Sequence, residues 1–232
     1  MGEKTRAFKA AFPHTLPILT GFLVLGTAYG VLLQTKGYSV LWALFTSLFI
    51  YAGSMQFVAV SMLSMGFQPL YACLMTLMVN ARHLFYGISM LEKLRGTGKL
   101  KPYLIFGMCD ETFSLLCTLE PPEGISRRWF FFFISLLDQA YWVAGSVIGS
   151  LLGSLIPFDT AGIDFVLTAM FVVIFLDQWR STKNHLPVLI GLGASLACLL
   201  LLGPDRFLLP SMALILLLVT LLRKPIERGE EG

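Results

Sequence analysis

The chain has 232 residues, of which 56% are hydrophobic and only 13% charged, and its mean hydropathy is +0.76. A soluble domain needs about 25% charged residues, so this composition excludes an ordinary soluble protein and predicts one that crosses a membrane several times. The net charge of +3 is small and there is no long basic run, which argues against nucleic acid as a partner.

Composition also limits the chemistry. The four cysteines lie in or beside apolar segments without metal-ligand spacing, so we expect small hydrophobic side chains, with no metal and no other cofactor. No phosphate-binding loop of the Walker type is present, which argues against direct use of ATP. The cysteines are Cys73, Cys109, Cys117 and Cys198.

We expect a single membrane domain over residues 1–232. Residues 1–12 contain Lys4, Arg6 and Lys9 and are predicted to form a short cytoplasmic arm. Residues 223–232 form a short charged tail.

Leu16–Leu33 is the first predicted span. It contains Gly26-x-x-x-Gly30, which provides a strip without side chains where another helix can approach closely. Alternatively, Pro17 together with Gly21 loosens the helix near a substrate path.

The second predicted span is Val40–Leu63. From Gly37 through Ala81 no residue is charged, so the polar Gln56 stands out in this region. Gly53 and Ser54 precede it, and a Gly/Ser pair is a place where helices kink or unwind. We predict a break here that frees backbone groups for a polar ligand.

The third predicted span, Leu70–Met90, places Asn80, Arg82 and His83 inside the helix. Polar groups at membrane depth are costly and usually functional. Two interpretations of Arg82 remain open: the side chain reaches an interface, or it binds a ligand or a carboxylate. His83 is interpreted as a packed neighbour.

Tyr103–Leu119 is short for a span and contains Asp110 and Glu111 near its middle. Two adjacent carboxylates in an apolar segment cost several kcal/mol if they are ionised and unpaired. We therefore expect either a broken or re-entrant helix that lines water, or neutralisation by a cation such as Arg82.

The fifth apolar segment, Trp129–Gly153, contains Asp138 and a further series of glycines at four-residue spacing. Asp138 is interpreted either as a proton carrier or as a polar group that holds helices together. The glycines of the series are Gly145, Gly149 and Gly153.

Three more apolar segments bring the prediction to an all-α polytopic protein with seven or eight transmembrane helices. They are Phe165–Leu176, followed by Asp177, then Leu186–Leu202 and Phe207–Leu222. The glycine pairs and the Gln-aromatic pairs that follow them occur twice in the chain, which favours two related halves.

Charge counting leaves the orientation open. Arg127 and Arg128 indicate a cytoplasmic position. The basic loop 93–101 lies outside if the Asp110 segment spans fully. If that segment is re-entrant, the loop lies inside and the amino terminus moves outside.

Four motifs in order resemble the AzlC family of branched-chain amino acid permeases over nearly the whole chain. They are Pro17-x-x-x-Gly21 with Gly26-x-x-x-Gly30, Ala52-Gly53-Ser54-Met55-Gln56-Phe57, Val79-Asn80-Ala81-Arg82-His83 and Asp110-Glu111-Thr112-Phe113. The resemblance implies an exporter of leucine, isoleucine and valine in the cytoplasmic membrane, which works with a small membrane subunit of the AzlD type.

We therefore expect secondary transport of a zwitterionic amino acid. Arg82 or freed amides near Gly53 would hold its carboxylate, and Asp110 or Glu111 would face its ammonium group. The expected substrate-binding residues are Gly53, Ser54, Gln56, Asn80, Arg82, Asp110 and Glu111. The expected proton-coupling residues are Asp110, Glu111 and Asp138, because burial disfavours a charged carboxylate.

Two other classes of function are weighed against transport. An intramembrane enzyme would need a catalytic group, but no His-Glu-x-x-His spacing appears and no Ser/His pair has a suggestive context. A passive channel or an assembly subunit is the other alternative, since a partner can supply part of the pathway.

Overall fold

The computed structural model describes residues 2–63, 66, 68–155, 172, 175–176, 179–180, 184–203 and 207–222. In these residues the regular structure consists of ten α-helices and one 3-10 turn, without a strand, so the all-helical prediction is confirmed. The chain divides into two compact units, Met1–Val166 and Leu167–Gly232. Most of the predicted span Phe165–Leu176, Asp177 and the tail 223–232 lie outside the described residues.

Two of the described helices are long and apolar enough to cross a membrane, so the seven or eight predicted spans are not confirmed. They are α1 (Glu3–Thr35) and α8 (Arg127–Leu155). α1 begins well before the predicted span, because residues 3–12 of the predicted arm form its first turns. It also continues through Pro17, so the described backbone shows no break there.

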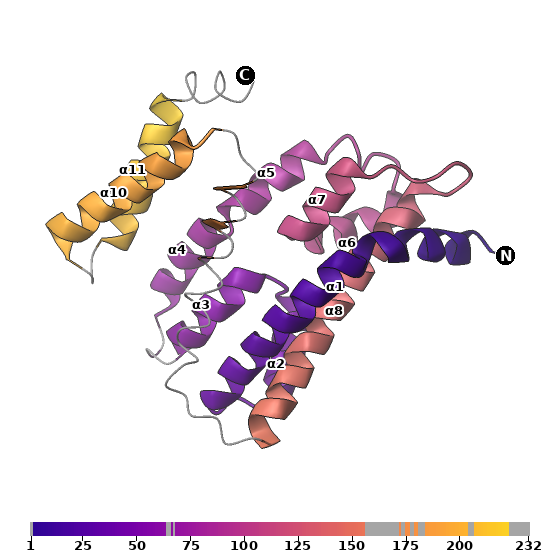
Figure 1. The fold of residues 1–232 in the computed structure, drawn as a ribbon, viewed down its shortest axis with the longest axis horizontal. Coiled ribbons are helices and arrows are strands. Elements are labelled where there is room, and N and C mark those ends of the chain that lie inside the picture. Colours follow the sequence, from indigo (N-terminus) through magenta and orange to yellow (C-terminus); the bar gives the residue numbers. More distant parts are fainter. Residues whose placement is uncertain are drawn as a thin grey trace. The chain divides into compact units, whose positions relative to one another are not determined.

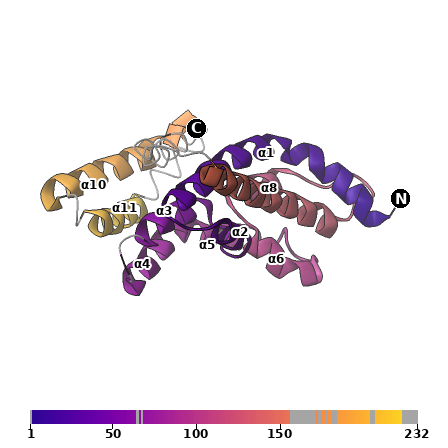
Figure 2. The same ribbon diagram turned by 90° about the horizontal axis from the view of Figure 1, so that it is seen from below.

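α1 and α8 lie side by side and run in the same direction (Figures 1 and 2). Near their first turns the Arg128 guanidinium lies 3.7 Å from the Glu3 carboxylate, and near their last turns Gly153 packs against Gln34. We call the end where both helices begin the basic end and the opposite end the far end. The basic residues in the first turns of the two helices are Lys4, Arg6, Lys9, Arg127 and Arg128.

Glycines make the contact between α1 and α8 possible. A Cβ atom at Gly30 would overlap the Ser146 carbonyl oxygen, and one at Gly149 would overlap the Thr27 carbonyl oxygen. Both neighbouring atoms belong to the backbone and have no other rotamer to adopt. The predicted role of the two glycine series in helix packing is therefore confirmed, and each series packs against the other helix.

The predicted span Val40–Leu63 is instead a helical hairpin of α2 (Val40–Phe49) and α3 (Gly53–Leu63). α2 starts at the far end, where the loop 36–39 leaves α1, and it points toward the basic end. The break predicted inside this span therefore goes further than an unwound turn, because it reverses the direction of the chain.

Contacts along the hairpin show this reversal. The Thr46 hydroxyl lies 2.8 Å from the Tyr29 hydroxyl, and further along α2 the Leu48 carbonyl accepts a hydrogen bond from Gln139 (2.9 Å), nearer the basic end. α3 then returns, because the Phe57 ring packs against Tyr29 again at 5.5 Å. The tip of the hairpin therefore lies about midway along α8.

The predicted break is confirmed, and it lies directly before Gly53 and Ser54. Tyr51 has a φ of 44°, in the left-handed region that residues other than glycine rarely adopt. The Gln56 side chain turns back and accepts a hydrogen bond from the Ala52 amide at 3.2 Å. It thereby satisfies one of the donors that the start of α3 leaves without a helical partner.

The predicted span Leu70–Met90 is also interrupted. α4 (Pro69–Val79) and α5 (Ala81–Ser89) meet at Asn80, which was expected inside one continuous helix. The two helices together pass from the far end to the basic end, since α4 follows α3 and Met90 packs beside α8 near its start.

A second hairpin enters from the basic end. α6 (Lys101–Phe106) follows the 3-10 turn Gly98–Leu100, and α7 (Asp110–Thr118) returns after a turn at residues 107–109. Leu104 of α6 and Leu116 of α7 both belong to the core at the basic end. The broken-helix prediction for this segment is therefore confirmed. The buried residues of this core are Ala11, Met90, Leu94, Leu104, Met108, Leu116, Phe130, Phe131 and Ile134.

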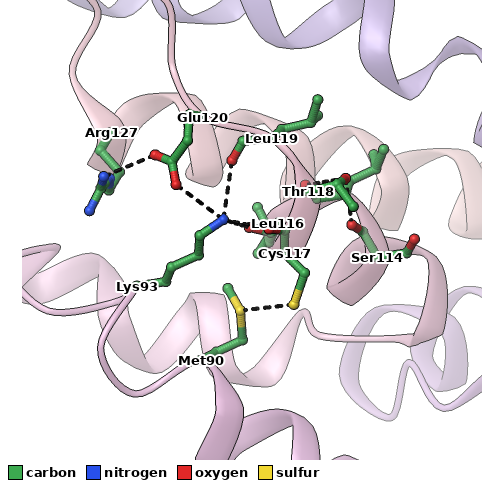
Figure 3. Close-up of polar contacts among 10 residues, drawn as sticks. Met90, Lys93, Ser114, Leu116, Cys117, Thr118, Leu119, Glu120 and Arg127 are labelled. Atoms are coloured by element: carbon green, nitrogen blue, oxygen red, sulfur yellow. Dashed lines mark hydrogen bonds and ion pairs between the residues drawn. The ribbon is translucent and has the colours of Figure 1, made fainter. Parts of the chain in front are cut away.

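Lys93 holds the returning end of this second hairpin (Figure 3). Its Nζ donates to the carbonyls of Leu116 (2.9 Å) and Cys117 (2.6 Å), which the end of α7 leaves without helical partners. Nζ also lies 3.2 Å from the Glu120 carboxylate, which pairs with Arg127 at 2.9 Å. The hydrogen bond from Lys93 lowers the pKa of Glu120 below its ordinary value.

The second unit is described over two helices that pack against each other, α10 (Leu186–Leu202) and α11 (Leu208–Leu221). They match the two aliphatic segments predicted at the end of the chain. Before α10, the His185 ring stacks on Trp179 with centroids 4.0 Å apart.

Replacing Gly149 with alanine tests the helix contact. Overpacking costs about 1–3 kcal/mol, and here the obstructing atom is backbone, so we expect Gly149→Ala to lower the unfolding temperature in detergent clearly. Gly21→Ala is the matched control, because a Cβ at Gly21 meets nothing within 4 Å. Equal unfolding temperatures for the two variants would contradict the packing role.

Candidate functional site

Three helix breaks in the described part of the first unit meet around one cavity of about 210 Å³. The α2–α3 turn contributes Ile50 to Ala52, the α4–α5 junction contributes Asn80, and the α6–α7 turn contributes Met108. This volume is below the range of about 300–1,000 Å³ found for drug-sized ligands, so it fits a smaller molecule. The remaining lining residues are His83, Gly87, Ile105 and Phe106.

Helix ends give this cavity its electrostatic character. α3, α5 and α7 begin at Gly53, Ala81 and Asp110, and each of these starts directly follows a break turn that lines the cavity. Helix starts carry partial positive charge, and the ends of α2, α4 and α6 at the same turns carry partial negative charge. A molecule with both a carboxylate and an ammonium group finds complementary partners in such a place.

A pair of opposite charges lies beside the cavity. Arg82 follows the cavity residue Asn80, and its guanidinium lies 2.9 Å from the Asp110 carboxylate. The side chains are 35% and 36% exposed, so a ligand can reach both. The Tyr86 hydroxyl donates to Asp110 at 2.6 Å and Arg82 donates to the Ser54 hydroxyl at 3.4 Å, which holds the pair between α3, α5 and α7.

The structure therefore brings several predicted residues together. The expected neutralisation of Asp110 by Arg82 is confirmed, and Ser54 joins the same cluster. Asn80 lines the cavity, and Gly53 begins α3 with open space where a Cβ would stand. Whether these residues bind substrate stays a prediction.

Gln56 lies in a different environment. It is buried, and its Oε1 accepts from the Trp142 ring nitrogen at 2.9 Å as well as from the Ala52 amide, while Nε2 donates to Ser47 at 3.3 Å. Most of its hydrogen-bonding capacity is thus used inside the protein. This position favours a role in holding α2 and α3 against α8.

The other two predicted carboxylates are separate from Arg82 in the described ion pairs. Glu111 is the second residue of α7 and is half-buried. Asp138 of α8 is fully buried and accepts a hydrogen bond from Thr112 at 2.7 Å. The sequence placed all three acids at membrane depth but did not distinguish their partners.

A larger apolar cavity of about 600 Å³ adjoins the first and shares Ile50 and Asn80 with it. Aliphatic and aromatic side chains of α1, α2, α3 and α4 line it, together with Gly66 and Gln68 of the far-end loop. It therefore connects the neighbourhood of the break turns with the far end. Its lining includes Leu33, Trp42, Met55, Val60, Leu63 and Tyr71.

Sequence reasoning missed three residues of this region. Tyr86 follows Arg82 by four residues, so helical spacing places both on one face and was an available signal. The left-handed Tyr51 had no local signal. Cys109, expected to be only a small hydrophobic residue, lies 3.7 Å from the Tyr51 hydroxyl and 3.2 Å from the Thr112 hydroxyl. His83 packs against Tyr86 (5.5 Å), as predicted.

The comparison with known proteins covers the residues of this site. Positions 17–156, which include the three break turns and the Arg82–Asp110 pair, match the model of the AzlC protein family. No solved structure matches the chain.

The chain is 53% identical to the branched-chain amino acid transport protein AzlC of Bacillus subtilis, over 97% of this chain and 88% of that protein. It is 45% identical to a membrane protein of Helicobacter pylori, over 98% of this chain and 100% of that protein. It is also 32% identical to the inner membrane protein YgaZ of Escherichia coli, over 82% and 80% of the two chains. The chain therefore belongs to the AzlC family.

Proposed function

We propose that this chain exports branched-chain amino acids across the cytoplasmic membrane in exchange for protons, together with a small AzlD-type membrane subunit. The observation that carries the proposal is the accessible Arg82–Asp110 pair beside the cavity where three helices break. The name of the Bacillus subtilis relative supports this substrate class and supports transport over catalysis.

Each part of a branched-chain amino acid finds a partner at this site. Its carboxylate binds Arg82 and the start of α3, and its ammonium group binds Asp110. The substrate thus inserts between the two side chains, and each of them exchanges its ion-pair partner for the opposite charge of the substrate. Its aliphatic side chain enters the apolar cavity between Met55 and Val60. Because the two protein charges already neutralise each other, the empty site avoids the cost of an unpaired charge.

The basic end lies on the cytoplasmic side in this proposal. Among the described residues of the first unit, the basic end carries nine lysines and arginines, whereas the far end carries Lys36. This distribution follows the rule that cytoplasmic segments are rich in lysine and arginine. The nine are Lys4, Arg6, Lys9, Lys93, Arg95, Lys99, Lys101, Arg127 and Arg128.

This orientation removes the conflict that charge counting left open. α1, α4 with α5, and α8 cross the membrane, and both hairpins are re-entrant, one from each side. Because the α2–α3 hairpin returns to the side from which it started, the amino terminus and the loop 93–101 lie together inside. Non-helical turns at membrane depth are tolerated where protein buries them, as it does at these tips.

Two parts of the proposal rest on general grounds. Uphill export needs an ion gradient, and buried acids such as Asp138 are candidates for carrying its proton. The AzlD-type subunit comes from the family resemblance.

Counterflow of labelled leucine in vesicles tests the substrate site, with and without a candidate AzlD-type subunit. A hydrogen bond to a charged group contributes about 1.5–3 kcal/mol, so we expect Arg82→Ala and Asp110→Asn to weaken apparent leucine affinity at least about tenfold. The matched control is Arg127→Ala, which breaks the surface pair with Glu120, also 2.9 Å long. Wild-type leucine affinity in Arg82→Ala would refute the proposed site.

Filling the smaller cavity tests it without removing a charge. Gly87 lines this cavity, and a Cβ there meets nothing within 4 Å, so Gly87→Val adds volume without displacing protein. We expect strongly reduced leucine counterflow at normal protein levels. Gly21→Val makes the same substitution at an open helix position outside the cavity and should keep its transport. Equal counterflow in both variants would exclude this cavity from the pathway.

Single cysteines test the orientation in intact cells. Lys99→Cys should react with a membrane-impermeant maleimide only after the membrane is opened, whereas Ser39→Cys, in the loop after α1, should react in intact cells. The wild-type chain sets the background from its four native cysteines. The opposite labelling pattern would reverse the proposed orientation, and equal labelling of both would refute the re-entrant α2–α3 hairpin.

A further inference from the structure

Asp138 is a buried acid for which the described residues provide no oppositely charged partner. Its residue is 0% exposed, and none of the ion pairs in the described part of the chain includes it. Among the described residues, one carboxylate oxygen of Asp138, Oδ1, has no hydrogen-bond partner, and neither has the buried hydroxyl of Ser135, one turn earlier on the same helix. Buried polar atoms without partners are rare in native proteins and need an explanation.

The other carboxylate oxygen ends a chain of hydrogen bonds. The Thr112 hydroxyl donates to Oδ2 of Asp138 at 2.7 Å. Because that hydroxyl has one proton, its oxygen accepts in its other contact, from the Cys109 thiol at 3.2 Å. The sulfur in turn accepts from the Tyr51 hydroxyl at 3.7 Å. All three donors therefore point toward Asp138.

This chain crosses the site where the two hairpins meet. Tyr51 belongs to the α2–α3 turn and lines the smaller cavity, while Cys109 belongs to the α6–α7 turn. The chain thus connects the cavity with the interior of α8. The same hydrogen bonds link the tips of the two hairpins through the side chains of Tyr51 and Cys109. The backbone of Tyr51 is the one held in the left-handed conformation.

The surroundings of Asp138 contain no described cation. The titratable groups that interact with it are Glu111 of α7, Tyr51, and Tyr103 of α6. α2 has no titratable side chain. On α1, His14 packs on Phe130, two turns before Asp138.

We infer that Asp138 binds the coupling proton and that Tyr51, Cys109 and Thr112 carry it between the cavity and the Asp138 carboxylate. Each group passes its own proton to the next acceptor and receives one from the group before it, so a proton taken up at the Tyr51 oxygen protonates Oδ2. The inference rests on the proposed function and separates its two tasks: Asp110, which is paired with Arg82, serves the substrate, and Asp138 serves the proton.

The test uses the full chain in proteoliposomes with the membrane potential held at zero, and with the AzlD-type subunit if counterflow requires it. For one proton per leucine, a gradient of one pH unit sustains about a tenfold leucine ratio. Asp138→Asn keeps the size of the side chain and an acceptor for Thr112 but does not titrate. We expect its leucine ratio to fall to about one, while leucine exchange at equal pH continues.

Matched variants separate the possible causes. Glu111→Gln removes the neighbouring carboxyl group and should lower the leucine ratio less than Asp138→Asn does. Asp138→Glu keeps the carboxyl group and should retain a leucine ratio above one. Tyr51→Phe removes the first donor of the chain and should slow the approach to the ratio more than it slows equal-pH exchange. Asp110→Asn should lose exchange itself.

Several results would overturn the assignment. These are a wild-type leucine ratio in Asp138→Asn, a lost ratio in Glu111→Gln, loss of exchange as well as ratio in correctly folded Asp138→Asn, or a wild-type ratio that follows sodium instead of pH. If Asp138→Asn does not fold, loss of the ratio in Asp138→Glu and an unchanged rate in Tyr51→Phe overturn it equally. Absence of leucine exchange in the wild type would instead refute the proposed function.

Discussion

A helix that breaks inside a membrane must satisfy the backbone groups that the break releases, because lipid offers no hydrogen bonds. The described part of the first unit contains three helix breaks, and it gathers them around one cavity. Specific side chains compensate the groups that the breaks release. The Gln56 side chain accepts a hydrogen bond from the Ala52 amide. Asp110 lies in the first turn of α7, where a negative charge is favoured. The remaining helix ends provide the partial charges on which a small zwitterion can bind.

The paired helices α1 and α8 provide the support for these breaks. Their glycine contact brings the two backbones too close to admit a Cβ atom at Gly30 or Gly149. Buried polar side chains then fasten the first hairpin to α8, through Ser47 with Ser146 at 2.8 Å and Gln56 with Trp142. The second hairpin is held at its base by Lys93 (Figure 3). Near its tip, Thr112 holds it by donating a hydrogen bond to Asp138. Both tips are thereby positioned from the same helix pair.

The polar residues divide by partner into two groups. Arg82 and Asp110 neutralise each other and remain accessible, as a site for a charged but overall neutral substrate requires. Asp138 is inaccessible and has no described cation, so any change in its charge must come from a proton or a small ion. In the proposed function, the separation of these groups lets one chain bind a substrate and a proton at different places. The hydrogen bonds through Cys109 link Asp138 to the cavity residue Tyr51.

The sequence by itself determined the all-helical class, the glycine packing and the break near Gly53, and it offered a broken helix at Asp110 and neutralisation by Arg82 as two alternatives. These follow from local properties: apolar length, absent side chains, and the cost of charge in an apolar segment. The predicted seven or eight spans did not follow equally well, because hydropathy reports the length of an apolar segment and not its direction. Val40–Leu63 is long enough to cross a membrane, yet the left-handed turn at Tyr51 folds it back. Only the tertiary structure decided that reversal, the partner of each acid and the role of Cys109, because these depend on contacts between residues far apart in the chain.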